Sequence, residues 1–322
     1  FSLATVLFLV IKKFYLKSRW EESGYDEIFS DIIIDDFPTQ FLTNPKFDYH
    51  NISGSFGGKY TLNERSQIIL NYSLASRPPN ASELFSDGLH HALARIEIGD
   101  IRFNKEIANR IASSYSYNNS RFNLLVEVFY NRIKDYIYLR PFEDNLDNRG
   151  AFGLWLYKQT NAELFGIDTN VTFEITKNFE WQNKSSLIKG YDIKTDLPLI
   201  NIPAFNSVNQ IMYKNEDWLN FSASLKSELF FEQKEFPNFN YEVLDQFTGE
   251  RFEIDISSPP QGFHLIHFYS ELTLKMNKRT NLNIGLGVNN VFNTSYRNYL
   301  NSLRYFADEL GRNIILQLKL NY

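Results

Sequence analysis

Cysteine is absent from this chain of 322 residues, which excludes disulfide bonds, thiolate metal sites and cysteine nucleophiles. The chain has no apolar run of about 18 residues or more, so the sequence predicts no transmembrane helix. A surplus of basic residues is missing too, because the net charge is −5. A chain of this charge offers no basic surface for nucleic acid. These absences disfavour disulfide-rich domains, helical membrane proteins and nucleic-acid-binding proteins.

Motifs of the common enzyme classes are also missing. The chain contains no Gly-x-Ser-x-Gly elbow, no His-Glu-x-x-His motif and no phosphate-binding glycine loop. Its five histidines leave a barrel hydrolase as an alternative. The sequence predicts a protein that is not an enzyme and has no resident cofactor.

Aromatic residues, by contrast, are abundant: they make up 16% of the chain, with 29 Phe and 19 Tyr. The mean hydropathy is negative, which would disfavour a membrane protein if membranes were crossed only by helices. In a transmembrane β-barrel only alternate residues contact lipid, and aromatic girdles mark both interfaces. The composition is therefore compatible with such a barrel.

The clearest pattern is an alternation of short and long connections between amphipathic segments. Tight polar turns are predicted at 62–64, 118–120, 177–179, 215–217 and 277–279. Long irregular loops are predicted between them, at 77–102, 140–157, 194–203, 234–262 and 293–311. Transmembrane barrels have short turns on the periplasmic side and long loops on the outside. The alternation therefore predicts a barrel of this type.

The segments between these connections have a hydrophobic period of two, as β-strands do. Half-buried strands of soluble sandwiches share this period, but they average five or six residues, whereas a tilted transmembrane strand needs roughly nine to eleven. The longer segments here favour the membrane. In 180–193 and 204–214 the alternation is blurred. The strands predicted are 5–17, 47–61, 65–76, 103–117, 121–139, 158–176, 180–193, 204–214, 218–233, 263–276, 280–292 and 312–322.

Alternation also predicts which side chains face lipid and which face the lumen. The residues expected to face lipid are Phe173, Phe221, Leu225, Ile284 and Leu286. Those expected to face the lumen are Glu174, Asn220, Lys226 and Asn283.

Both ends of the chain carry patterns of their own. The apolar run 1–11 is interpreted as a barrel strand, with a membrane anchor or a mistranslated edge as alternatives; Lys12 and Lys13 follow it, whereas in a signal peptide they would precede it. The chain has no initiator Met, so a fragment is expected. The C-terminus alternates apolar residues and finishes on Tyr322. This ending resembles the signal that the barrel-insertion machinery reads in outer-membrane proteins, although a last strand can also end in Tyr by chance.

Four sequence blocks carry recognisable motifs. The first closes one strand, crosses a loop and opens the next strand; its residues are Arg77, Pro78, Glu83, Leu84, Gly88, His90, Glu97, Gly99 and Glu106. The second opens a strand with Tyr157, Gln159, Gly166 and Asp168. The third contains Asn290, Phe292 and Tyr296, and the fourth is Gly311-Arg312. Together these blocks resemble TonB-dependent outer-membrane receptors, with three departures: Asp100 for Asn, Phe103-Asn104-Lys105 for Leu-x-Pro, and Asp168 for Glu.

The resemblance implies an all-β, antiparallel transmembrane barrel of 22 strands that encloses an N-terminal plug domain. The chain supplies about twelve strands and has no candidate for the plug, so it resembles the C-terminal part of such a receptor. The matching region is 47–322, and residues 1–46 match poorly.

One predicted loop contains the candidate ligand-binding residues His90, His91, Glu83 and Asp87. Imidazole and carboxylate groups together bind transition metals. The alternative is that these are scaffold residues of the family loop, and the metal is unknown. His264 and His267 are three positions apart on a strand and so face opposite sides. The following aromatic residues could contact a chelate or belong to the outer girdle: Phe230, Phe231, Phe236, Phe239 and Tyr241.

The function implied by the resemblance is active transport across the outer membrane of a Gram-negative bacterium. The expected ligand is a metal chelate (siderophore, haem or zinc), and TonB would supply energy through the missing plug. Other expected partners are the barrel-assembly machinery and the lipid bilayer. The alternative is a passive porin or a barrel enzyme that is complete at about twelve strands.

Overall fold

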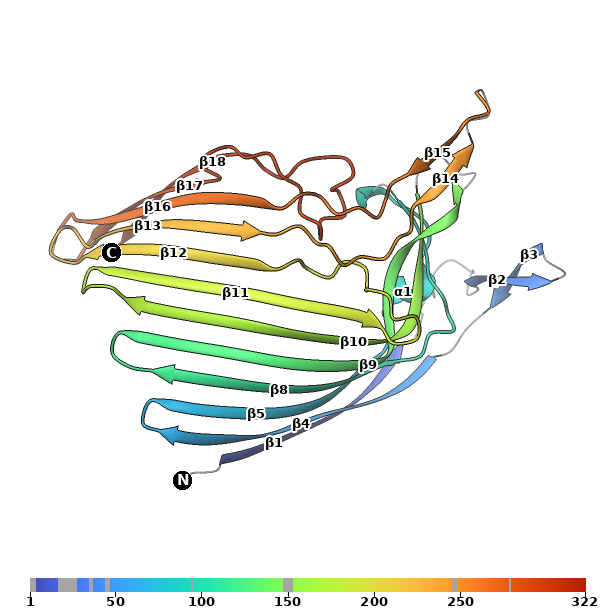
Figure 1. Ribbon diagram of the computed structural model, residues 1–322, viewed down its shortest axis with the longest axis horizontal. Coiled ribbons are helices and arrows are strands. Elements are labelled where there is room, and N and C mark those ends of the chain that lie inside the picture. The colour runs from blue at the N-terminus through green and yellow to red at the C-terminus, as the bar shows by residue number, and fades with distance from the viewer. Residues whose placement is uncertain are drawn as a thin grey trace.

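The computed structural model describes residues 4–16, 28–34, 37–43, 47–93, 95–146, 153–244, 248–277 and 279–322. Its main feature is a curved 14-stranded sheet (Figure 1). Apart from β6 and β7, the sheet consists of antiparallel strands in chain order: β1 (Ala4–Leu16), β4 (Phe47–Asn63), β5 (Ser66–Arg77), β8 (Glu106–Asn118), β9 (Phe122–Leu146), β10 (Gly153–Glu174), β11 (Phe179–Asp192), β12 (Asn206–Asn215), β13 (Phe221–Phe230), β16 (Phe263–Lys275), β17 (Asn281–Asn289) and β18 (Asn313–Asn321).

All twelve predicted strands are confirmed, including the two with blurred alternation, which are β11 and β12. The apolar N-terminal run forms β1, which pairs with β4 from Ala4 to Leu16. Within the described part of the chain, β1 and β18 stand at the two ends of the strand order and are not paired with each other. The sheet is therefore open. The predicted division at residue 46 stays a prediction.

The short turns lie at one end of the sheet and the long loops at the other (Figure 1). Several turns close through an asparagine side chain that accepts backbone N–H groups two or three residues on. Asn119 Oδ1 accepts from Arg121 N and Phe122 N, both at 2.8 Å, and Asn277 Oδ1 accepts from Arg279 N at 2.8 Å. Such turns are local, which is why the sequence alone reveals them.

The expectation of irregular long loops holds for 194–203 and 293–311, which contain no helix or strand, and is wrong for 77–102, 140–157 and 234–262. The loop after β5 contains α1 (Ala81–Phe85), β6 (Asp87–His90), the 3₁₀-helix η1 (His91–Leu93) and β7 (Arg95–Ile98). A hairpin of β14 (Tyr241–Leu244) and β15 (Arg251–Ile254) occupies the loop after β13, and β2 (Ile28–Ile34) pairs with β3 (Phe37–Thr43). Much of the predicted loop 140–157 is strand, because β9 and β10 extend into it.

No helix in the described segments is long and apolar enough to cross a membrane.

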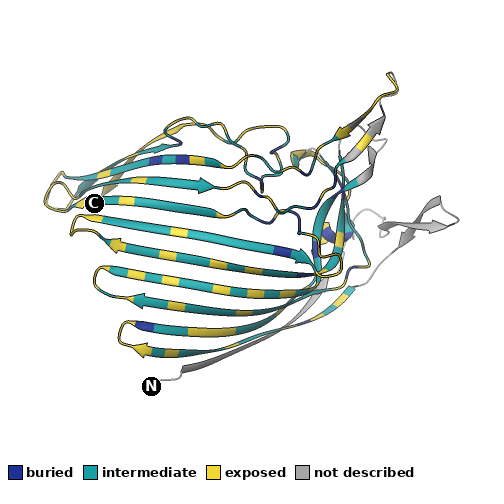
Figure 2. Ribbon diagram, in the orientation of Figure 1, coloured by how far each residue is buried: buried dark blue, intermediate teal, exposed yellow. Residues whose placement is uncertain are grey.

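The sheet has an apolar face and a polar face. Leu225 lies in register with the apolar residues Ile211 and Phe268. Figure 2 shows exposed positions, in yellow, recurring along the strands. Lys226, the neighbour of Leu225, lies in register with Gln210 and His267 on the opposite face. We call the face of Leu225 the outer face and the face of Lys226 the inner face. This pairing agrees with the predicted alternation.

One residue of the predicted lumen set is misplaced. Asn220 is not on a strand: with Leu219 it forms the turn before β13, at φ values of 46° and 54°. Asparagine adopts this left-handed conformation more readily than most residues, which accounts for its place in the turn.

Buried apolar side chains gather at the long-loop end of the sheet. Three small clusters are found there in the described residues: Leu84, Phe103 and Ile137; Trp155, Ile200 and Phe239; and Ala162, Leu199 and Ile202. Loops and strand ends are therefore packed together at this end.

Candidate functional site

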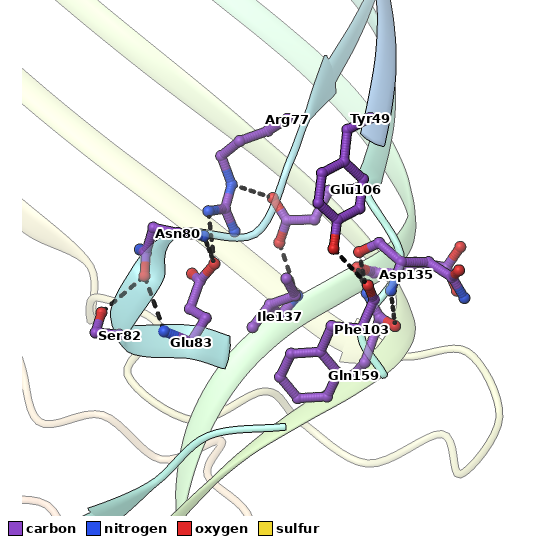
Figure 3. A network of polar contacts seen from close by, with 11 residues as sticks. Tyr49, Arg77, Asn80, Ser82, Glu83, Phe103, Glu106, Asp135, Ile137 and Gln159 are labelled. Atoms are coloured by element: carbon purple, nitrogen blue, oxygen red, sulfur yellow. Dashed lines mark hydrogen bonds and ion pairs between the residues drawn. The ribbon is translucent and has the colours of Figure 1, made fainter. Parts of the chain in front are cut away.

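Arg77, at the end of β5, is the centre of a charged network that we call the rim network (Figure 3). Its Nη1 donates to Glu83 Oε2 at 2.9 Å, and its Nε donates to Glu106 Oε2 at 2.6 Å. The second oxygen of Glu106 accepts from the backbone N–H of Ile137 at 2.7 Å. Charge-assisted bonds of this kind are strong. They tie the loop helix α1 to β5, β8 and β9.

Glu83 has a second structural role as part of a capping box on α1. Its N–H donates to Asn80 Oδ1 at 2.9 Å, and its carboxylate accepts from Asn80 N at 2.8 Å. Each side chain satisfies a backbone donor of the other residue. Glu83 is 7% exposed, and its carboxylate is engaged by Arg77 and Asn80. This geometry supports a structural role, and its contact with a ligand stays a prediction.

Two residues that depart from the family pattern, Phe103 and Asn104, pack and hydrogen-bond where the loop rejoins the sheet. Phe103 is buried against Leu84, and its carbonyl accepts from Tyr49 Oη at 3.1 Å. Asn104 and Gln159 exchange two hydrogen bonds, of 2.8 and 3.1 Å. The loop therefore returns to the sheet through contacts with both β4 and β10.

Asp100, which stands where Asn is usual, also closes a turn. It accepts from the guanidinium of Arg102 at 2.7 and 2.9 Å and from Arg102 N at 2.9 Å. Burial raises the pKa of the Asp100 carboxyl, but the hydrogen bonds from Arg102 outweigh burial and hold the pKa below its ordinary value. Asp100 is therefore ionised at neutral pH.

Glu97 and Gly99 fasten the other side of the loop. Glu97 is almost fully buried and accepts from Arg95 Nε at 2.7 Å and from Tyr157 Oη at 3.1 Å. Gly99 lies against the end of α1: a Cβ on it would come within 2.7 Å of both the Glu83 carbonyl oxygen and the Leu84 carbonyl carbon. Both atoms are backbone, so this contact requires glycine.

Replacing Gly99 by alanine is expected to loosen this loop. The clash displaces backbone, and overpacking of this kind costs about 1–3 kcal/mol. Limited proteolysis of the folded full-length protein should therefore cut the Gly99→Ala variant faster within 86–105. Gly58→Ala is the matched control, because a Cβ at Gly58 meets nothing within 4 Å. Equal cleavage of the two variants would contradict the packing role.

A second group of loop residues stacks arginine on aromatic rings, and we call it the loop cluster: Arg95, Trp155, Tyr299, Arg304 and Tyr305. The Arg95 guanidinium lies 4.9 Å from the Trp155 ring centre. Arg304 lies 4.6 Å from the rings of both Tyr299 and Tyr305. Contacts of cations with ring faces are attractive, more so when water is excluded.

The loop cluster joins loops that are far apart in the sequence. Tyr305 Oη donates to the Ile256 carbonyl at 2.9 Å, and its ring lies 6.5 Å from that of Trp155. Arg95 reaches Ser302 at 3.5 Å. Burial raises the pKa of Tyr305 and outweighs the opposing effect of Arg304. The hydroxyl therefore stays protonated and able to donate.

The other predicted ligand residues lie at the surface of the same loop. His90 is the last residue of β6 and His91 the first of η1, and both are exposed, as is Asp87. Across the segments that the structure describes, no three His, Asp or Glu side chains are grouped to hold a metal ion. Ligand binding by His90, His91 and Asp87 stays a prediction.

His264 and His267 face opposite sides, as predicted. His264 Nε2 lies 2.7 Å from Ser227 Oγ on the outer face. His267 Nδ1 lies 3.2 Å from Asn289 Oδ1 on the inner face. The two rings therefore cannot bind one ion together.

The two C-terminal motifs meet before β18. Asn290 has a φ of 49° and exchanges two 2.8 Å hydrogen bonds with Thr294, which hold the turn. Asn293 Oδ1 accepts from Arg312 N at 2.9 Å, and a Cβ on Gly311 would lie 2.7 Å from this oxygen. These contacts support structural roles for Asn290, Gly311 and Arg312.

The remaining motif residues differ in their surroundings. Tyr296 packs on Phe263 with ring centres 4.5 Å apart, whereas Phe292 and Tyr322 are exposed. The role of Tyr322 in barrel assembly stays a prediction.

A family model described as "TonB dependent receptor-like, beta-barrel" matches residues 18–303. The chain belongs to this family. Its fold is that of the family's β-barrel, and the family resides in the Gram-negative outer membrane.

Several solved structures of TonB-dependent receptors resemble the chain. One is titled "Copper transporter OprC": TM-score 0.67, 16% identity, covering 86% of this chain and 41% of that one. The apoprotein form of the FrpB iron transporter from Neisseria meningitidis has a TM-score of 0.63 and 17% identity, covering 99% of this chain and 43% of that one. A ferric enterobactin receptor mutant from Pseudomonas aeruginosa has a TM-score of 0.57 and 15% identity, covering 84% and 40%. The chain therefore spans less than half the length of these receptors.

The loop cluster was missed by sequence reasoning. Its residues come from three separate parts of the chain, around Arg95, around Trp155 and at 299–305, and no local motif joins them. The one available signal is the presence of arginine beside aromatic residues in predicted loops of a TonB-dependent receptor barrel. Phe239 was considered, and the structure buries it against Trp155 and Ile200.

Proposed function

We propose that this chain is part of the barrel of an outer-membrane receptor that actively imports a metal chelate. The observation that supports the proposal is the packing of the long loops into one assembly at a single end of the family's barrel sheet. Loops on a rigid scaffold commonly carry binding residues. The resembling structures are titled as a copper transporter, an iron transporter and a ferric enterobactin receptor.

Energy would come from TonB, acting through a plug domain outside this sequence. The barrel-assembly machinery would insert the protein into the outer membrane. The ligand would be a siderophore, haem, zinc or another metal complex. The loop cluster holds the long loops together, since Trp155, Tyr299 and Arg304 are buried.

The test is uptake by a receptor-deleted strain that carries the full-length gene. We expect the gene to restore accumulation of one radiolabelled iron, copper, zinc or haem source, and deletion of TonB to abolish it. Accumulation that is independent of TonB would instead indicate a passive porin. A full-length protein that restores uptake of none of these sources would contradict the proposed substrate class.

Replacing His90 and His91 together by alanine is expected to weaken this uptake. Both side chains are exposed, so the free energy of unfolding should change by no more than about 0.5 kcal/mol. His50→Ala is the matched control, since His50 is an exposed histidine near the start of β4, at the long-loop end of the sheet (Figure 1). Uptake and the amount of heat-resistant barrel are measured for both variants. Unchanged uptake would leave His90 and His91 as scaffold residues.

A further inference from the structure

The outer face of the sheet carries a group of uncharged polar side chains among apolar ones. Asn183 and Ser185 of β11 pair in register with Asn209 and Ser207 of β12. Asn209 and Ser207 lie two and four positions from Ile211 along β12. Asn183 and Ser185 lie two and four positions from Trp181, the register partner of Ile211 on β11, so all four share the outer face. We call these four residues the outer polar patch.

The outer polar patch is bonded internally. Asn183 Nδ2 donates to Ser207 Oγ and Asn209 Oδ1, both at 3.0 Å. The Ser185 hydroxyl lies 2.9 Å from Ser207 Oγ and 3.1 Å from Asn183 Oδ1, and it can donate to only one of them. Among the contacts described for this face, the Asn209 amide donates one long bond, of 3.5 Å. The patch therefore retains donors and acceptors for a partner.

The outer polar patch lies between two pairs of aromatic rings. Toward the short turns, Tyr213 of β12 packs on Phe179 with ring centres 4.9 Å apart. Toward the long loops, Phe205 packs on Phe231 at 5.1 Å. Aromatic girdles mark the two membrane interfaces of a barrel. Ser207 and Asn209, between positions 205 and 213, therefore lie at the depth of the hydrocarbon layer.

Neighbouring strands extend this polar surface. Ser227 of β13 pairs in register with Asn209, and its hydroxyl lies 2.7 Å from His264 Nε2 of β16. Exposed apolar side chains border the surface, with Ile211 at 48% and Leu225 at 51%. Polar side chains facing hydrocarbon are costly and characteristically face protein.

No part of a larger barrel would cover the outer polar patch. Additional strands would join the sheet at its edges, which are β1 and β18, whereas β11 and β12 are interior strands. A domain inside the lumen would lie on the other face, where Lys226 and His267 are found. The occupant must therefore come from another molecule.

We propose that the outer polar patch is the contact between two copies of this protein. Two copies inserted in one membrane have the same orientation, so a two-fold axis that relates them runs along the membrane normal. Each residue of one copy therefore contacts residues of the other copy at the same depth in the membrane. The patch is uncharged and contains both donors and acceptors, so it is complementary to itself. The proposal goes beyond metal uptake but rests on the membrane placement given under the proposed function.

A cysteine placed in the patch tests the contact, because this chain has none of its own. In the full-length protein, with any cysteine outside this chain replaced, Asn209→Cys should form a disulfide-linked species of twice the monomer mass in oxidised membranes. Leu70→Cys is the control: it is on the outer face of β5, is 55% exposed and should stay monomeric. Recovery of both variants in the outer-membrane fraction tests the membrane placement separately.

A second variant tests the polar groups themselves. Asn183→Leu with Asn209→Leu should keep the heat-resistant barrel, because leucine suits lipid, and should weaken dimerisation about tenfold. Native mass measurement in mild detergent reports the dimer. The proposal is overturned if Asn209→Cys gives only monomer or cross-links only to a protein of another mass. It is also overturned if the two leucine substitutions leave dimerisation unchanged.

Discussion

Expressed alone and refolded in detergent, the 322-residue chain is expected to form no heat-resistant barrel and to conduct no ions. Its sheet ends in two edges, β1 and β18, that are not paired with each other in the described structure. Unpaired backbone groups cost several kcal/mol each in hydrocarbon, so an open sheet does not persist there. The full-length receptor is the positive control.

The measurements are the shift in gel mobility on heating and single-channel conductance in a planar bilayer. A heat-resistant monomer that conducts ions would show that the barrel closes at these twelve strands. It would then favour the passive porin over the receptor.

Placing arginine at Leu225 should cost the full-length barrel about 2–4 kcal/mol of stability, because the residue lies on the outer face near mid-strand. Ser224→Arg is the matched control, since its neighbouring position faces inward, in register with Met212 and Tyr269. Denaturant titration in lipid vesicles gives both free energies of unfolding. Equal penalties would show that the two faces have been assigned wrongly.

The blurred alternation of two predicted strands has a structural explanation. Asn183 and Ser185 interrupt the apolar face of β11, and Ser207 and Asn209 interrupt that of β12. Each strand by itself reads as a weak pattern. The register of the pair places the four interruptions together, so the irregularity is a shared feature of two strands.

The candidate site was only partly predictable for a similar reason. The capping box joins Asn80 and Glu83, which are three positions apart, and is visible in the sequence, because helix caps form from neighbours. Arg77 and Glu106 were identified through the family motif, but their contact with each other was not. The contact of Arg95 with Ser302 joins residues 207 positions apart, which no local pattern predicts.

By itself, the sequence determined the twelve antiparallel strands of the main sheet, most of their faces and the short turns. A period of two depends only on the geometry of successive residues, and an asparagine turn closes within three residues. Only the tertiary structure decided which side chains meet across strands and loops. Register and loop packing place Arg95 against Trp155, and Asn183 against Asn209. Such contacts depend on pairing between distant segments, so their energies appear only once the sheet has formed.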